Sequence, residues 1–327
     1  MPQETKRVDR QLRWLADGYE QAQRKRIATG EQIRSVLQGR DETWTIGEEE
    51  WVEVIRQVMG EEEALEADDV LADIAAGRSL GPVPLLGRTY ERYYGEEGDL
   101  QKLMVTTLHQ HATWPWLEKV KGVGGTLGCE LIARLDIEVA RTPSAFSAYC
   151  GLATVPGEEW KCAECGKGRT WSVGTKVTGN HTVLNGTKRC PSKMVMVKGP
   201  EDGVRAAMPR GFLVDFEDPE TGEVKQRRPY DAQAKKLCYL IATSFLKQKG
   251  KYEQFYRDCR AKLEIERPHW APIGKHHTAL RKTEKLFLSH LWLIWREAEG
   301  LPITQPYSHT VLGHDTKPIG PWEMVED

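Results

Sequence analysis

Residues 116–134 read WLEKVKGVGGTLGCELIAR, two helix-forming stretches joined by a glycine-rich turn. Glycines let a backbone turn tightly, and the first amides of a helix have no partners within that helix. The pattern predicts a helix-hairpin-helix that binds a phosphate at the start of its second helix, without selecting a base sequence. Its candidate phosphate-binding residues are Lys119, Lys121, Gly122, Gly124, Gly125 and Thr126. A turn between two core helices would show the same pattern.

The first forty residues carry the spacing of a coiled coil. Apolar residues recur in a 4-3-4-3 stripe made of Val8, Leu12, Leu15, Tyr19, Ala22, Ile33 and Val36. Arg26 and Thr29 take the intervening seam positions, and Gly30 is expected to weaken the helix there.

A second long helix is expected from about Thr89 to His111, after a break at residues 81–84. Residues 41–100 hold 4 basic and 17 acidic side chains, a net charge of −13, which is typical of a solvated helical face. Residues 45–48 have the spacing of a capping box. The two long helices predict an antiparallel hairpin arm or a dimer-forming arm, with packing onto their own domain as the alternative.

The second half of the chain is basic, although the whole chain has a net charge of −2. Residues 151–300 hold 27 basic and 18 acidic side chains, a net charge of +9. Between Trp160 and Lys198 eight basic side chains accompany one acidic side chain, Glu164. This segment is a candidate phosphate-binding surface, represented by Lys167, Arg169 and Lys176. A solvated loop is the alternative.

Cysteines in the same segment have the spacing of a zinc knuckle. Cys162 and Cys165 are separated by two residues and followed by glycine, and Cys190 is the third candidate ligand. A zinc ribbon would place a fourth cysteine near position 193, where this chain has lysine. His181 is the nearest other donor, and Cys150 is a further candidate. The spacing predicts structural zinc, and free surface thiols or a lost metal site are the alternatives.

Helical patterns resume after the cysteines. Residues 231–249 and 276–299 have core spacing, and the second stretch begins with basic residues that oppose the helix dipole. A nearby anion would relieve that conflict. The candidate nucleic-acid-binding residues of this part are Lys235, Lys236, Arg281 and Lys282. A structural surface cluster is the alternative for His277 and Arg281.

The sequence thus predicts a mainly α protein in three parts. These are a helical coiled-coil arm with an acidic insert (1–112), a helix-hairpin-helix domain (113–300) and an extended tail (301–327). A small β-rich, zinc-ribbon-like insertion is expected at residues 157–228. No run of 18 apolar residues and no apolar leader is present, so we expect a cytoplasmic protein with reduced thiols and no membrane contact.

Several motifs resemble the C-terminal domain of the "IS-one-ten" group of insertion-sequence transposases. After the glycine hairpin come TPSAFSAYCGL (142–152), DAQAKKLCY (231–239), Phe255-Tyr256 and Ala279-Leu-Arg-Lys282, in the order and spacing of that family. The resemblance covers about residues 115–298, interrupted by the zinc-knuckle insertion, and the preceding arm is similar as well. It implies a protein that binds DNA and takes part in transposition.

Two departures from the family bear on activity. Family members begin with a RuvC-like nuclease domain, and we expect none here. The resemblance also implies a serine nucleophile after a Gly-Leu-x-Pro stretch, but Gly151-Leu-Ala-Thr-Val-Pro156 is followed by Gly-Glu-Glu-Trp. Ser172 is the nearest substitute, and a serine nucleophile needs a positioned base or acidic partners. Whether the chain is an enzyme stays open.

We therefore expect a transposase-like DNA-binding protein without autonomous cleavage, homodimeric through its arm, whose partner is DNA or a guide-like RNA. An active serine-type recombinase that uses Ser172 is the second hypothesis. A protein-interaction scaffold is the third, and it would bind its partner without the steep salt dependence that phosphate contacts cause.

Overall fold

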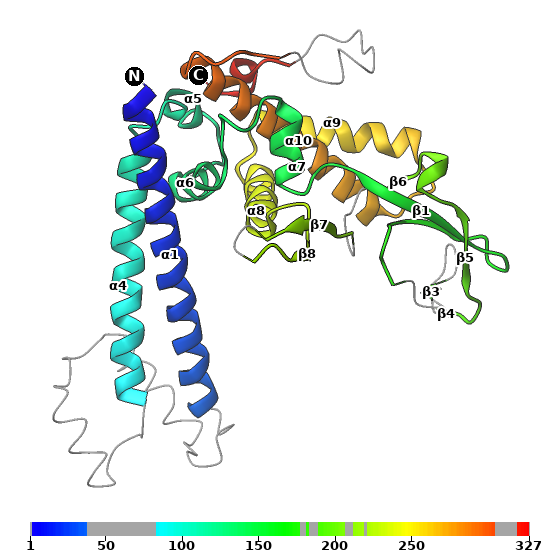
Figure 1. Cartoon of the computed structure of the whole chain (residues 1–327), viewed down its shortest axis with the longest axis horizontal. Coiled ribbons are helices and arrows are strands. Elements are labelled where there is room, and N and C mark those ends of the chain that lie inside the picture. Colours follow the sequence, from blue (N-terminus) through cyan, green and yellow to red (C-terminus); the bar gives the residue numbers. More distant parts are fainter. Residues whose placement is uncertain are drawn as a thin grey trace. The chain divides into compact units, whose positions relative to one another are not determined.

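The chain forms two compact units, which span Met1–His111 and Ala112–Asp327. The computed structural model describes residues 2–37, 83–176, 181–182, 189–206, 212–218, 221–304 and 319–326. Helices dominate both units, and the small antiparallel sheets that the structure describes lie in the second unit (Figure 1). The prediction of a mainly helical protein with a small β-rich part is confirmed at this level.

The first unit is an antiparallel pair of helices, α1 (Pro2–Leu37) and α4 (Val83–Leu108) (Figure 1). Their side-chain pairs run in opposite directions along the two segments. Near its start, α1 places Asp9 Oδ1 3.1 Å from Nε2 of His111. Further along, Arg26 forms an ion pair with Glu97. The apolar stripe of α1 is therefore covered within the same chain, because helix α4 packs along it.

The predicted stripe is the buried seam of this pair. Its described members from Val8 to Ile33 are buried, and Met104 and Leu108 of α4 are fully buried. At the polar centre, the ion pair with Glu97 raises the pKa of Arg26 above its ordinary value. The helix continues through Gly30, where a Cβ would lie 3.3 Å from the ring of Tyr90. Arg26 and Gly30 therefore accommodate partners on α4 instead of interrupting α1.

The start of the second helix differs from the prediction. Helix α4 begins at Val83, six residues before Thr89. Pro84 stands in its first turn, where the missing N–H costs no hydrogen bond and the fixed φ suits a helix. The expected capping box at residues 45–48 and most of the acidic block lie outside the described residues.

The second unit packs its helices around one long central helix, α10 (Pro272–Ala298) (Figure 1). The other helices, in chain order, are α5 (Trp114–Leu117), α6 (Gly125–Arg134), α7 (Pro143–Tyr149), α8 (Ala232–Gln248) and α9 (Lys251–Glu266). Asp231 caps helix α8 by accepting a hydrogen bond from the amide of Ala234 at 2.6 Å.

An aromatic cluster forms the core of this unit. The Phe287 ring of α10 lies 5.9 Å from Trp116 and 5.4 Å from Phe245 between ring centroids. Tyr252 stacks on Phe245 at 4.6 Å. All four rings are buried. The cluster joins α5, α8, α9 and α10, so it connects segments that are far apart in the sequence.

Phe287→Ala is expected to destabilise the protein by about 3–5 kcal/mol, because it removes a buried ring and leaves a cavity. Urea unfolding followed by circular dichroism measures this loss. Ile265→Ala is the matched control, since Ile265 is 82% exposed on α9. Its expected effect is within about 0.5 kcal/mol. Equal effects of the two substitutions would contradict the assigned core.

The β-rich part lies between α7 and α8. Strand β1 (Val155–Cys162) pairs with β2 (Gly168–Ser172) on one side and with β5 (Met194–Lys198) on the other, and its start pairs with β6 (Arg205–Ala206). Two short hairpins complete it, made by β3 (His181–Thr182) with β4 (Arg189–Cys190) and by β7 (Val214–Glu217) with β8 (Val224–Arg227). All these pairings are antiparallel.

The described end of the tail is anchored to the helical body. A short 3₁₀ turn, η2 (Pro321–Met324), follows an extended residue, Gly320. The side chains of Pro321 and Met324 are buried, and the indole N–H of Trp116 donates to the carbonyl of Pro321 at 3.1 Å. Most of the expected tail, residues 305–318, lies outside the described residues.

Candidate metal centre and nucleic-acid surface

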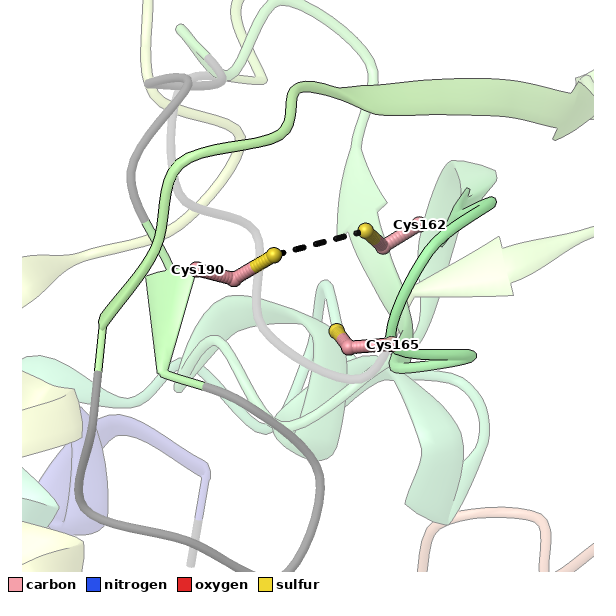
Figure 2. A group of neighbouring side chains, drawn as sticks. All are labelled: Cys162, Cys165 and Cys190. Carbon is pink, nitrogen blue, oxygen red and sulfur yellow. Dashed lines mark hydrogen bonds between the residues drawn. The ribbon is translucent and has the colours of Figure 1, made fainter.

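Three cysteine sulfur atoms meet at one end of the insertion (Figure 2). Cys162 ends strand β1, Cys165 lies in the turn that follows, and Cys190 ends strand β4. Their sulfur atoms all lie within 4.8 Å of one another, and those of Cys162 and Cys190 are 3.9 Å apart. Two thiolates bound tetrahedrally to zinc are separated by about 3.8 Å, given Zn–S bonds of about 2.3 Å. The sulfur positions are therefore compatible with a bound zinc ion. The sulfur atoms of Cys162 and Cys190 are too far apart for a disulfide bond.

A tight turn brings the first two thiols together. The amide of Gly166 donates to the carbonyl of Cys162 at 3.0 Å, and the amide of Cys162 donates to the carbonyl of Lys167 at the same distance. Gly166 has φ of +71°, a conformation that favours glycine. This is why the knuckle sequence places glycine directly after Cys165.

A small apolar cluster surrounds the sulfur atoms. Cys162, Cys190 and Met194 are buried, and the partly buried Trp160 and Trp171 pack against them. The two indole rings meet edge to face at 6.2 Å. Because few of the described side chains are buried here, this cluster is a small source of hydrophobic stabilisation, which is the situation in which a structural metal contributes most.

The candidates for a fourth ligand lie in different parts of the second unit relative to the three sulfur atoms. The β3–β4 register pairs His181 directly with Cys190, while the His181 side chain lies outside the described part of the chain. Cys150 is buried beside Cys238 in the helical body, not at the sulfur cluster. Glu164, which sequence reasoning did not consider as a ligand, has a carboxylate oxygen 4.0 Å from the sulfur of Cys190. Its position between the two knuckle cysteines is the signal that points to it.

The glycine-rich turn joins a very short helix to a longer one. Helix α5 is a single turn, and helix α6 begins after Gly124, which is extended. Gly122 has φ of +103°, and a Cβ there would lie 2.9 Å from the ring of Phe245. Packing against the core by itself therefore requires glycine at position 122, whether or not a phosphate binds.

Both candidate lysines of the turn are exposed and contacted by the tail. Nζ of Lys119 lies 6.0 Å from the Trp322 ring, and Nζ of Lys121 lies 3.5 Å from Oε2 of Glu326. Gly125 and Thr126 open helix α6, which has no side-chain cap at Gly124.

The candidate cations of the insertion lie mainly on its surface. Arg169 is exposed on β2, with its guanidinium 5.9 Å from the Trp171 ring. Lys176 is exposed and Lys167 is half-buried.

The candidate cations of the helical body divide into two kinds. Lys236 and Lys282 are exposed, and Nζ of Lys235 lies 4.7 Å from the Tyr230 ring. Arg281, in contrast, donates to the backbone carbonyls of Leu152 and Ala153, and burial lowers its pKa. Arg281 thus holds the segment that leads into strand β1.

Ser172 is fully buried at the end of β2, and its hydroxyl is 2.9 Å from that of Thr175. The structure therefore places the candidate nucleophile in the interior of the sheet region, not on its surface.

Two buried titratable residues were missed by sequence reasoning. Glu284 on α10 is 7% exposed, and burial raises the pKa of its carboxyl to about 7, against the pull of Arg281 and Lys235. Burial also lowers the pKa of His290 to about 4. The hydroxyl of Tyr252 donates to Nδ1 of His290 at 2.8 Å, while Nε2 donates to the carbonyl of Ile319 at 2.9 Å.

Comparison with protein families, curated proteins and solved structures finds no match to this chain. Among the described residues, no helix is both long enough and apolar enough to cross a membrane.

Proposed function

We propose that this chain is a zinc-containing nucleic-acid-binding protein, similar to the C-terminal domain of "IS-one-ten" transposases, that contacts DNA without cutting it. One observation carries the proposal: a cysteine cluster of zinc-like geometry lies within a strongly basic segment, and most of the cations that the structure describes there are exposed. The described cations that are exposed are Lys161, Arg169, Lys176, Lys193 and Lys198. A metal that orders such a segment would give its cations a defined arrangement for binding phosphates.

The proposed zinc ligands are Cys162, Cys165, Cys190 and His181. The sulfur distances support the three thiolates. Residues directly opposite each other in an antiparallel pair share one face, so the register of His181 with Cys190 supports histidine as the fourth ligand. Zinc here would be structural, because four protein ligands leave no open position for a substrate.

The glycine-rich turn is the second proposed contact with the phosphate backbone. Lys119 and Lys121 are exposed beside the start of α6, where amides and the helix dipole favour an anion. These contacts would position nucleic acid of any sequence.

A dimer through the arm would need the outer faces of α1 and α4, since the stripe of α1 is already buried within the chain.

The active-recombinase hypothesis has less support. It needs a hydroxyl that reaches DNA, and Ser172 is buried against Thr175. We therefore propose a binding role rather than serine-type strand transfer.

Lys121→Ala and Arg169→Ala are each expected to weaken DNA binding roughly 3- to 10-fold at low salt, for every DNA sequence tested. The slope of log K against log salt should fall by about 0.9 for each phosphate that the protein no longer neutralises. Fluorescence anisotropy with two unrelated labelled duplexes over a salt series measures both quantities.

Lys102→Ala is the matched control, because Lys102 is an exposed lysine of the first unit paired with Asp99. It removes the same charge and should leave the slope unchanged. Salt-independent binding, or equal effects of the three substitutions, would contradict the proposed surface and favour a protein-interaction scaffold.

A further inference from the structure

The described end of the tail is fastened beside the glycine-rich turn. Trp116 donates to the carbonyl of Pro321, and His290 donates to the carbonyl of Ile319 at 2.9 Å. The side chain of Met324 is buried. These hydrogen bonds hold residues 319–321 at a fixed place, so the described side chains that follow have a defined direction.

From that anchor the tail reaches both lysines of the turn. Trp322 is 52% exposed, and its ring faces Lys119 at 6.0 Å. The Glu326 carboxylate meets Lys121 at 3.5 Å. A carboxylate and a phosphate oxygen are both anionic acceptors, and an ammonium group binds either one. The tail therefore gives Lys121 the kind of partner that a nucleic-acid backbone would give it.

A third element completes the surroundings of Glu326. Gly250 is the N-cap of the sixteen-residue helix α9, and it has no side-chain cap. A Cβ at Gly250 would lie 3.1 Å from Oε1 of Glu326 and 3.1 Å from Cβ of Lys121. The carboxylate thus sits against the positive end of a helix as well as against a lysine, and both favour an anion there.

The ion pair between Lys121 and Glu326 is open to displacement by another anion. The side chains of Lys121 and Glu326 are 45% and 41% exposed, so water and salt screen the pair. A nucleic-acid backbone offers several phosphates at once and gains from release of its counterions, which a single carboxylate does not.

We propose that the C-terminal tail is an internal competitor of nucleic acid, with Glu326 occupying at Lys121 the place of a backbone phosphate and Trp322 covering Lys119. This proposal rests on the nucleic-acid binding proposed above and adds its regulation. Binding of the phosphate backbone displaces the tail, and the tail lowers the affinity for short or weakly charged ligands most.

Glu326→Gln in the full chain tests it, because the amide keeps the shape and removes the charge. Loss of an exposed ion pair should tighten binding of a labelled DNA duplex about threefold at low salt. The salt slope should steepen by up to about 0.9, since in the unsubstituted protein the displaced Glu326 carboxylate binds cations again and so offsets part of the counterion release. Glu297→Gln is the matched control, as Glu297 is an exposed acid on α10 and gives the same change in net charge.

A double substitution separates a local effect from a general one. In a Lys121→Ala background, Glu326→Gln should no longer tighten binding. Equal affinities of the Glu326→Gln and Glu297→Gln proteins would overturn the competition alone, as would an undiminished effect in the Lys121→Ala background. Absence of DNA binding by every variant at low salt would overturn the nucleic-acid proposal itself, and this inference with it.

Discussion

The purified protein is expected to carry about one zinc ion per chain, and the Cys165→Ser protein to carry none. Three thiolates within 4.8 Å of one another repel unless a cation lies between them, so the cluster needs either protons or a metal. Cys165 is the best residue to replace because it is only half-buried, whereas Cys162 and Cys190 also fill the small core. Elemental analysis of the protein after gel filtration measures the stoichiometry.

Loss of the metal should unfold the insertion and leave the helices intact. Structural zinc contributes on the order of 10 kcal/mol of apparent binding free energy, and the cluster around Met194 offers little to replace it. The aromatic core around Phe287 lies in the helical body and does not depend on the sulfur atoms. Near-ultraviolet circular dichroism of Trp160 and Trp171 should be lost on chelation, while the far-ultraviolet helical signal should change little.

Cys259→Ser is the control for thiol removal, since Cys259 is also half-buried but lies on α9. It should keep full zinc and a full tryptophan signal. His181→Ala should weaken zinc binding while retaining the three thiolates, if histidine is the fourth ligand. A metal-free preparation with the native tryptophan signal would exclude a structural role for zinc.

Glu284→Gln is expected to stabilise the protein by up to about 3 kcal/mol at pH 8 and by little at pH 4. Burial raises the pKa of this carboxyl from 4.5 to about 7. Between these two values the folded protein binds more protons than the unfolded chain does. The free energy of unfolding therefore falls as the pH rises from about 4.5 to about 7, and glutamine removes that loss.

His290 has the opposite effect on how the free energy of unfolding depends on pH. Burial lowers its pKa from 6.5 to about 4, so between these values the unfolded chain binds more protons. The neutral ring is also the form that accepts from Tyr252 while donating to Ile319. This residue therefore makes the free energy of unfolding fall as the pH decreases from about 6.5 to about 4.

The effects of Glu284 and His290 on the free energy of unfolding have opposite signs over nearly the same pH range. The wild-type protein should show little net dependence from these two residues, whereas Glu284→Gln should lose stability steeply on acidification, by up to about 1.4 kcal/mol per pH unit. Denaturant unfolding at a series of pH values measures both curves, and zinc loss at acid pH affects them equally. Parallel curves for the wild-type and Glu284→Gln proteins would refute the raised pKa of Glu284. The same curve for Glu284→Gln and the control Glu297→Gln would refute it as well.

The features that could be predicted from the sequence are those that depend on residues close together in the chain. The stripe from Val8 to Ile33 became a buried seam because helical periodicity alone places those side chains on one face. The pair Cys162 and Cys165 converged because a two-residue spacing and a following glycine define a tight turn. The boundary at Val83 was missed because proline signals both a break and a first helical turn.

The sequence by itself determined the helical class of the protein, the β-rich insertion and the cysteine triplet, since each depends on periodicity or short spacing. Only the tertiary structure decided that Ser172 is buried, that Arg281 binds backbone carbonyls and that Glu284 is desolvated. It also placed Glu326 beside Lys121, 205 positions away. Burial and long-range pairing depend on how distant segments pack together, and no local pattern of residue types contains that information.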